Sequence, residues 1–167
     1  SCSAIDAAGN SVTGTFDVTV EFVDDAPPTL GLPTGITAEA TGADGAPVTW
    51  TATATDAVDG ALTPTCSPVP GTFPLGSTTV SCSATDTAGN TATGSFDVGV
   101  VDTTTPTLAL PGDITAAAPD ESGAQVTWSA SASDLVDGTV PVTCIPAPGQ
   151  FAVGVTEVSC SATDAAG

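Results

Sequence analysis

Residues 81–90 read Ser-Cys-Ser-Ala-Thr-Asp-Thr-Ala-Gly-Asn, and closely similar stretches occupy residues 1–10 and 159–167. The cysteines of the three stretches, Cys2, Cys82 and Cys160, are almost evenly spaced, and Trp50 and Trp128 recur at the same interval as Cys82 and Cys160. Self-similarity at a fixed period of this kind is typical of repeat architectures. We therefore expect the chain to be a window of a longer tandem array, which favours a structural or adhesive rod over a protein with a one-off catalytic site.

The composition excludes several classes of partner. The chain has no Lys, Arg or His against 19 Asp and Glu, which gives a formal charge of −19. Nucleic-acid binding needs Lys and Arg to replace the counterions of the phosphates, and attraction to anionic lipid needs them as well. No apolar run approaches the roughly 18 residues of a membrane span. We expect no nucleic-acid partner and no membrane insertion in this window, which leaves cations, basic partners or solvation alone.

The missing residue types also remove chemistry. Without His and Lys there is no imidazole base and no Schiff base, so an enzyme would have only Asp, Glu, Ser, Thr and Cys to work with. We therefore do not expect an enzyme.

Strands are indicated by strict alternation of apolar and polar residues. Residues 12–22 alternate in this way, the pattern recurs at residues 92–100, and shorter versions occupy residues 48–54 and 80–84. No stretch has a helical period, so the sequence predicts an all-β chain. The aromatic residues expected on the inward faces, in the core, are Trp50, Trp128, Phe16 and Phe96. For the two tryptophans, an exposed sugar-stacking platform is the alternative.

Two seams divide the chain, at residues 24–28 (Asp-Asp-Ala-Pro-Pro) and residues 102–106 (Asp-Thr-Thr-Thr-Pro). Between them we expect six or seven short antiparallel strands, enough for one small β-sandwich. The predicted units are residues 1–24 (the end of a preceding repeat), 25–102 (a complete repeat) and 103–167 (a repeat without its last strand).

The last unit should expose an apolar sheet edge, because it lacks the equivalent of residues 90–101. We expect the continuing chain of the array to supply that strand. Strand addition by residues 10–22 of another copy is the alternative.

The five cysteines fit a pattern of bridges within units. Cys66 precedes Cys82 by the same interval at which Cys144 precedes Cys160, while the expected partner of Cys2 lies outside the window. A small unit with a thin core gains about 3 kcal/mol from each such bridge. Free buried thiols and a zinc site are the alternatives, although zinc lacks His ligands and a C-x-x-C motif here. Disulfides would imply an oxidising, extracellular setting.

The motif string resembles the hyalin-repeat (HYR) family. The resemblance covers the whole window and rests on Pro-Val-Thr-Trp (47–50), Ala-Thr-Asp-Ala-Val-Asp-Gly (54–60), the long run from Thr65 to Asn90, and Ser-Phe-Asp-Val-Gly-Val-Val-Asp (95–102). It implies an immunoglobulin-like fold, an extracellular adhesive or structural role in tandem arrays, and no known catalytic residues. Many relatives have a further Cys near the place that Gly14 and Gly94 occupy here, so the resemblance implies no additional bridge in this chain.

Acidic residues recur at strand ends and at the seams. Asp56 with Asp59, and the equivalent pair in the next repeat, could cap turns, bind calcium or serve glycoside hydrolysis; their recurrence in every copy favours the turn. Acids at the seams, near Asp86 and Asn90 or the turns of the next unit, could pool oxygen ligands for calcium and stiffen the joint. The candidate calcium ligands are Asp24, Asp25, Asp102, Asp56, Asp59, Asp134 and Asp137.

These patterns together predict a structural subunit of an extracellular fibre or filament, built from tandem immunoglobulin-like β-sandwiches in an elongated array. An adhesin stalk, stiffened by calcium and presenting a binding domain outside this window, is the alternative. The expected location is extracellular or at the cell surface. The expected partners are copies of the same chain and surface or matrix components, and calcium is the only cofactor that the sequence suggests.

Overall fold

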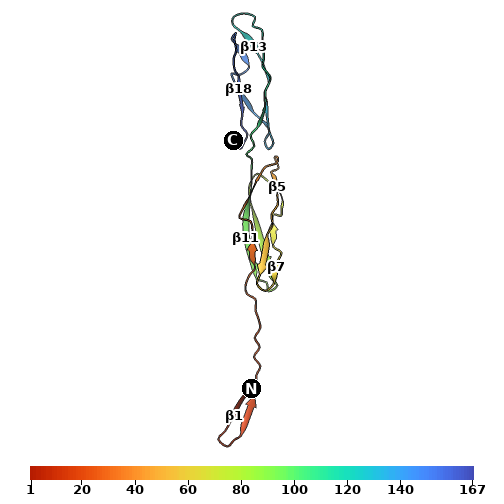
Figure 1. Ribbon diagram of the computed structural model, residues 1–167, viewed down its shortest axis with the longest axis vertical. Helices are drawn as coiled ribbons and strands as arrows, with labels where there is room; N and C mark the ends of the chain where they lie inside the picture. Colours follow the sequence, from red (N-terminus) through yellow and green to blue (C-terminus); the bar gives the residue numbers. More distant parts are fainter.

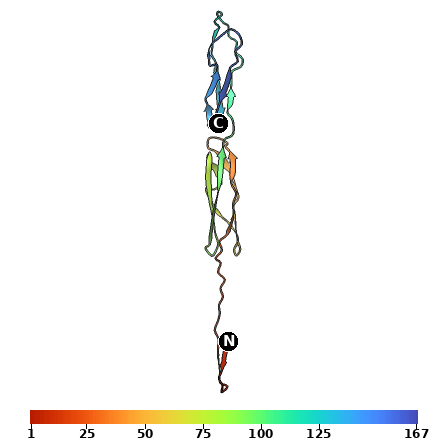
Figure 2. The same ribbon diagram turned by 90° about the vertical axis from the view of Figure 1, so that its left-hand side faces the viewer.

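Eighteen β-strands and no helix make up the computed structural model, which describes residues 1–167. The strands form three bodies in a line: an N-terminal hairpin (β1–β2), a central body (β3–β11) and a C-terminal body (β12–β18) (Figure 1). The same linear arrangement is seen after a quarter turn (Figure 2). The predicted all-β class and elongated tandem array are therefore confirmed, and the small sheets are consistent with immunoglobulin-like sandwiches. Because the chain forms no helix, it has no helical segment that could span a membrane.

The central body contains nine strands in three sheets, ordered β4-β11-β10-β8, β3-β6-β7 and β5-β9. Two expectations are wrong here: there are more than six or seven strands, and β11 pairs with β4 in parallel. Most of these strands have only three or four residues, too few for alternation to show in the sequence. The strands are β3 Thr29–Gly31, β4 Ile36–Glu39, β5 Ala46–Val48, β6 Thr53–Asp56, β7 Gly60–Leu62, β8 Thr65–Ser67, β9 Gly71–Phe73, β10 Gly76–Thr85 and β11 Thr91–Val101.

The core of the central body is built on the long β10–β11 hairpin. Alternate residues of both strands point inward, because successive side chains of a strand face opposite sides. Phe96, Val98 and Val80 are buried in this way. Trp50 covers them, with its ring edge-on to Phe96 at 5.4 Å between centroids. Burial of each large apolar side chain contributes about 1.5–3 kcal/mol, so this hairpin holds much of the stabilising apolar surface.

The C-terminal body repeats the central one, except that its third sheet has counterparts of β8 and β10 only. Its sheets β12-β14-β15, β13-β17 and β16-β18 match β3-β6-β7, β5-β9 and β8-β10. The register is also repeated, because Ala124 pairs with Phe151 as Ala46 pairs with Phe73. The strands are β12 Thr107–Ala109, β13 Ala124–Val126, β14 Ser131–Asp134, β15 Gly138–Val140, β16 Val142–Ile145, β17 Gly149–Phe151 and β18 Ser159–Ala162. The exact unit boundaries stay a prediction.

Two disulfides join directly opposed strand residues. Cys66 of β8 pairs with Cys82 of β10, and Cys144 of β16 pairs with Cys160 of β18; the Cα atoms of each pair are 4.1 Å apart. Cys2 is free and exposed. Each bridge therefore joins two neighbouring strands of one sheet, β8 to β10 in the central body and β16 to β18 in the C-terminal body.

The N-terminal segment departs from the prediction. Only Ser11–Gly14 (β2) forms a strand, paired with Cys2–Ile5 (β1), and residues 15–22 are extended and unpaired. Phe16, expected in the core, has 75% of its surface exposed, whereas Phe96 has 5%. The reason is that Phe96 packs against Trp50 within the central body, while residues 15–22 lie between two bodies and have no sheet behind them (Figure 1).

Residues 48–54 also differ from the prediction of a single strand. The segment ends β5 at Val48 and begins β6 at Thr53, with the residues between them outside any strand. β5 pairs with β9 and β6 pairs with β3, so the chain crosses from one sheet to another over this short stretch. The alternation that predicted one strand is kept across the crossing, and Trp50 still packs on the core.

Candidate metal centre

Two clusters of aspartates stand out from the other acidic residues. In each cluster, carboxylate oxygens of three aspartates lie within 4.8 Å of one another. Every member of one cluster has its counterpart at the equivalent repeat position in the other, so the arrangement belongs to the repeat. The first triad is Asp24, Asp56 and Asp86, and the second triad is Asp102, Asp134 and Asp164.

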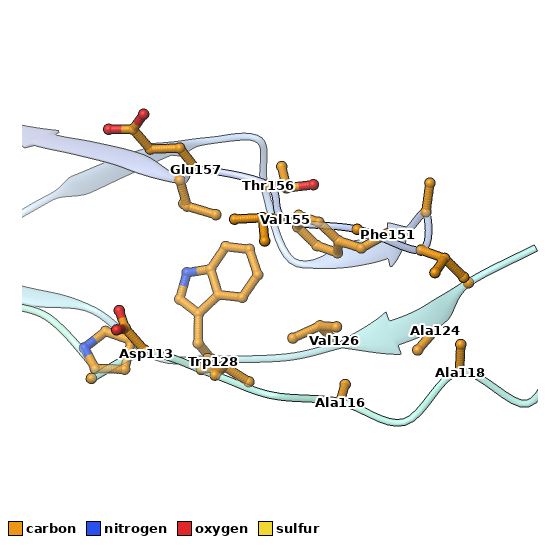
Figure 3. Close-up of a pocket in the computed structure, with 18 of the residues that line it drawn as sticks. Asp113, Ala116, Ala118, Ala124, Val126, Trp128, Phe151, Val155, Thr156 and Glu157 are labelled. Atoms are coloured by element: carbon orange, nitrogen blue, oxygen red, sulfur yellow. The ribbon is translucent and has the colours of Figure 1, made fainter.

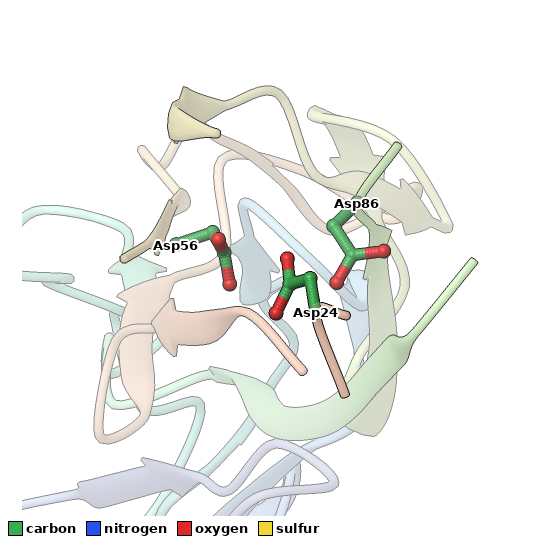
Figure 4. Close-up of side chains that lie close together, drawn as sticks. All are labelled: Asp24, Asp56 and Asp86. Atoms are coloured by element: carbon green, nitrogen blue, oxygen red, sulfur yellow. The ribbon is translucent and has the colours of Figure 1, made fainter. Parts of the chain in front are cut away.

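Three separate segments bring each triad together. In the first triad, Asp24 lies in the linker that enters the central body, Asp56 ends β6, and Asp86 directly follows β10. The three side chains converge from these segments (Figure 4). The β6–β7 and β10–β11 turns lie at the same end of the body, where the linker arrives (Figure 1). The site is therefore a junction between one unit and the chain that precedes it.

The turn after β6 holds the second member of each triad. One carboxylate oxygen of Asp56 accepts hydrogen bonds from the N–H groups of Val58 at 2.7 Å and Asp59 at 3.1 Å. These donors hold the pKa of Asp56 below its ordinary value. In the second triad, N–H groups in the turn likewise lower the pKa of Asp134, that of Asp137 most of all. Both carboxylates are thus kept ionised at neutral pH, with one oxygen each engaged in the turn.

The turn after β10 is hydrogen-bonded to the linker. Asp86 accepts hydrogen bonds from the backbone N–H of Asn90 at 2.7 Å and from its side-chain amide at 2.8 Å. The same amide also donates to the backbone carbonyl of Asp24 at 3.1 Å. This network places the Asp24 side chain beside the two turns without using its carboxylate.

Two carboxylate oxygens in the triads are buried and have no hydrogen-bond partner: Oδ2 of Asp24 and Oδ2 of Asp134. Only 9% of the surface of Asp134 is exposed. A buried charge without a partner is destabilising, and three carboxylates so close repel one another. Since the chain contains no Lys, Arg or His, no side chain can neutralise either triad. Hard oxygen donors of this kind suit calcium, magnesium or manganese.

The candidate ligands chosen from the sequence divide into two groups. The triads contain four of them, Asp24, Asp56, Asp102 and Asp134, and leave out the other three. Asp59 accepts hydrogen bonds from the backbone and hydroxyl groups of Thr87, and Asp137 from the backbone of Ala165. Asp25 is exposed and belongs to neither triad.

Asp86 and Asp164 are triad members that were not chosen as ligands. The available signal was the recurring Ala-Thr-Asp at the ends of β10 and β18. It becomes informative only once the topology puts the two turns at one end of the body.

A second contact holds the linker between the two bodies. Glu39, at the end of β4, accepts hydrogen bonds from the backbone N–H of Thr103 at 2.7 Å and from its hydroxyl at 3.0 Å. These bonds, with another from the Thr104 hydroxyl, keep the pKa of Glu39 below its usual value. Asp102 thus lies next to a contact with the central body and forms the second triad with two aspartates of the C-terminal body.

A cavity of about 640 Å³ lies in the C-terminal body and is lined by Trp128, Phe151, Val126 and Val155 among others (Figure 3). The equivalent space of the central body is filled by Phe96 and its neighbours on β11. The cavity walls are therefore core residues, with Trp128 and Phe151 at 5.6 Å between ring centroids. We interpret the cavity as an uncovered core face, which gives no reason to assign a small-molecule ligand.

Comparisons with known proteins agree with the repeat pattern. The model of the HYR domain matches residues 23–100 and again residues 101–167. The chain is 37% identical over 171 aligned residues to Hyalin of Strongylocentrotus purpuratus, which covers 97% of the chain and 14% of that protein. It is 41% identical over 112 residues to Hyalin of Lytechinus variegatus, which covers 64% of the chain and 21% of that protein. The chain thus spans a small part of the length of these relatives. Because the family model accounts for two successive segments that together make up most of the sequence, the chain belongs to the HYR domain family.

Proposed function

We propose that this chain is a structural subunit of an extracellular, adhesion-related fibre built from tandem HYR repeats. The observation that carries the proposal is the end-to-end alignment of the β-bodies on one long axis (Figure 2). Each body joins its neighbour through a linker, so length grows with repeat number while the cross-section stays constant. This is the geometry of a spacer or filament.

The extracellular location rests on the chemistry of the chain. Two disulfides within small bodies are typical of oxidising compartments. The absence of Lys and Arg leaves no site for trypsin-like proteases. The similarity to proteins named Hyalin supports the same assignment. Partners at the cell surface or in a matrix, besides copies of the chain itself, are part of the proposal.

We propose a non-catalytic role. The paired acids Asp56/Asp59 and Asp134/Asp137, which could have suggested hydrolysis, hold equivalent turns in both bodies. A group that repeats with the fold and is engaged in backbone hydrogen bonds gives no reason to assign catalysis.

Strand addition is a specific mode of self-association that the chain could use. Phe16 lies in a motif nearly identical to that of Phe96 but is exposed, while the C-terminal body has an uncovered core face. A segment equivalent to β11 would place its Phe in that space. The predicted units of residues 1–24, 25–102 and 103–167 remain the framework of this proposal.

Electron microscopy of the native protein tests the function. Regular filaments whose axial repeat equals one or two bodies are the expected result. Separate flexible strings that each carry a distinct head would contradict a fibre and support the stalk, and the search for function would move to the head.

A further inference from the structure

We propose that each of the two aspartate triads binds one calcium ion, and that the bound ion fixes the joint between successive repeats. The inference does not depend on fibre formation, because the triads are complete within a single chain.

The first step of the argument is the donor set. Both triads offer carboxylate oxygens alone, without the nitrogen or sulfur donors that select zinc or copper. Calcium takes six to eight oxygen ligands in flexible geometry, whereas magnesium requires a near-ideal octahedron. Three carboxylates arriving from a linker and two turns, with backbone carbonyls and water to complete the shell, fit calcium better.

The second step is the unused oxygen. In Asp134, Oδ1 accepts the N–H groups of Val136 at 2.7 Å and Asp137 at 3.1 Å. Its other oxygen, Oδ2, is buried and receives nothing, in a residue with 9% of its surface exposed. Oδ2 of Asp24 is in the same condition in the first triad. A side chain held through one oxygen leaves the other free for an ion, and the carboxylates of the first triad converge on one another (Figure 4).

The third step is charge. Each triad brings three carboxylates to within 4.8 Å, and the chain has no basic side chain anywhere. Any neutralising charge must therefore come from outside the protein. A divalent cation can contact all three carboxylates at once and neutralises more of their charge than a monovalent ion does.

The mechanical consequence follows from the second junction. Thr103 is already attached to the central body through Glu39. Its neighbour Asp102 belongs to the triad of the C-terminal body. An ion at that triad would attach the linker to the C-terminal body, as Glu39 attaches it to the central one. Without the ion, repulsion among the carboxylates favours opening of the joint.

Calcium titration of the full chain by isothermal calorimetry in about 0.15 M NaCl, where the Debye length is about 8 Å, tests the site. We expect two saturable sites per chain, with dissociation constants on the order of 0.1–1 mM as in other extracellular modules. In Asp134→Asn, whose amide oxygen can still accept the turn hydrogen bonds, one site should weaken at least about tenfold. The matched control is Asp44→Asn, an equal change of charge at an exposed acid outside both triads, which should keep both sites.

Absence of saturable uptake, equal effects of the two variants, or magnesium binding as tight as calcium binding would each overturn the proposal. If Asp134→Asn disturbs the circular dichroism spectrum, Asp102→Asn in the linker replaces it with the same expectation. Small-angle X-ray scattering supplies a second readout: calcium should narrow the distribution of end-to-end distances in the parent chain and less so in the variant. Because these measurements use single chains, their outcome is separate from whether the native protein forms filaments.

Discussion

Phe96 and Phe16 carry the same side chain in nearly the same motif, but only Phe96 is enclosed by a body of the fold. Phe96 packs edge-on to Trp50 and is almost fully buried, while three quarters of the Phe16 surface is exposed. Phe96→Ala should therefore lower the free energy of unfolding of the central body by about 3–5 kcal/mol. Phe16→Ala, the matched control, should change it by less than about 0.5 kcal/mol. Urea unfolding followed by circular dichroism measures both, and similar losses would mean that residues 15–22 pack on a body in solution.

Glu39 predicts a pH dependence of the joint. Its pKa is lowered in the folded chain, first by the Thr103 N–H, from an ordinary value of 4.5. A lowered carboxyl pKa means that the stabilising contribution is fully present above the unfolded-state value and is lost as the pH falls through the folded-state value. The hydrogen bonds from Thr103 to Glu39 should thus persist at neutral pH and be lost below about pH 4.5.

The backbone amide of Thr103 reports this release in nuclear magnetic resonance spectra. We expect its chemical shift to titrate with a midpoint below 4.5, since Glu39 is the group that accepts its hydrogen bond. In Glu39→Gln, that titration should disappear. A Thr103 titration that is identical in the variant would show that Glu39 does not accept a hydrogen bond from Thr103 in solution.

The turn before β5 depends on a glycine. Gly45 has φ of +99°, and a Cβ at this position would overlap the backbone carbonyl of Phe73 in β9. Gly45→Ala should lower the free energy of unfolding by about 1–3 kcal/mol for the backbone conformation alone, and by more because β5 and β9 must separate. Gly42→Ala in the same turn, where φ is not positive and no atom lies within 4 Å, should cost less than about 1 kcal/mol. Thermal unfolding measures the difference, and equal losses would contradict the pairing of β5 with β9.

Strands were predictable where they are long and have one buried face. The β10–β11 hairpin shows this best, because its alternation is strict over residues 80–84 and 92–100. β7 and β9 have three residues each, which is too short for a period to appear. The parallel pairing of β4 with β11 joins two segments that are far apart in the sequence, and no local pattern encodes such a contact. For residues 15–22 the alternation was real, but burial also needs a second sheet, which this stretch does not have within the chain.

The candidate metal centre was predictable in part for a related reason. Acidic residues at strand ends and seams could be chosen as candidate ligands from the sequence, because polar residues at such places are solvated, cap turns or bind ions. Which of them meet depends on where the turns lie in space. Asp86 lies close to Asp56 because the β6–β7 and β10–β11 turns share one end of the body. Asp59 instead accepts hydrogen bonds from Thr87 and is not part of the triad. Topology therefore decides the ligand set, and residue type only limits the choice.

At the scale of the whole molecule, the two large bodies repeat in topology but differ in how completely they are packed. The buried core cluster of 9 residues lies entirely in the central body. In the C-terminal body, Trp128 and Phe151 instead line a cavity of about 640 Å³. Because apolar burial is the dominant favourable term in folding, the two bodies should differ in stability although their strand registers match.

Separate unfolding of the two bodies is therefore expected, and each contains one tryptophan that can report it. Trp50→Phe leaves Trp128 as the only fluorescent probe of the C-terminal body, and Trp128→Phe leaves Trp50 as the probe of the central body. The Trp128 signal should change at a lower urea concentration than the Trp50 signal, because the C-terminal body is less completely packed. Each substitution lies in the body that is not being observed, and distant sites are close to additive, so it should hardly alter the observed transition. Circular dichroism of the parent chain should then show two steps. Coincident midpoints would mean that the linker, through Glu39 and Thr103, couples the two bodies strongly. The better-packed body would then keep the other folded, and the rod would unfold as one cooperative unit.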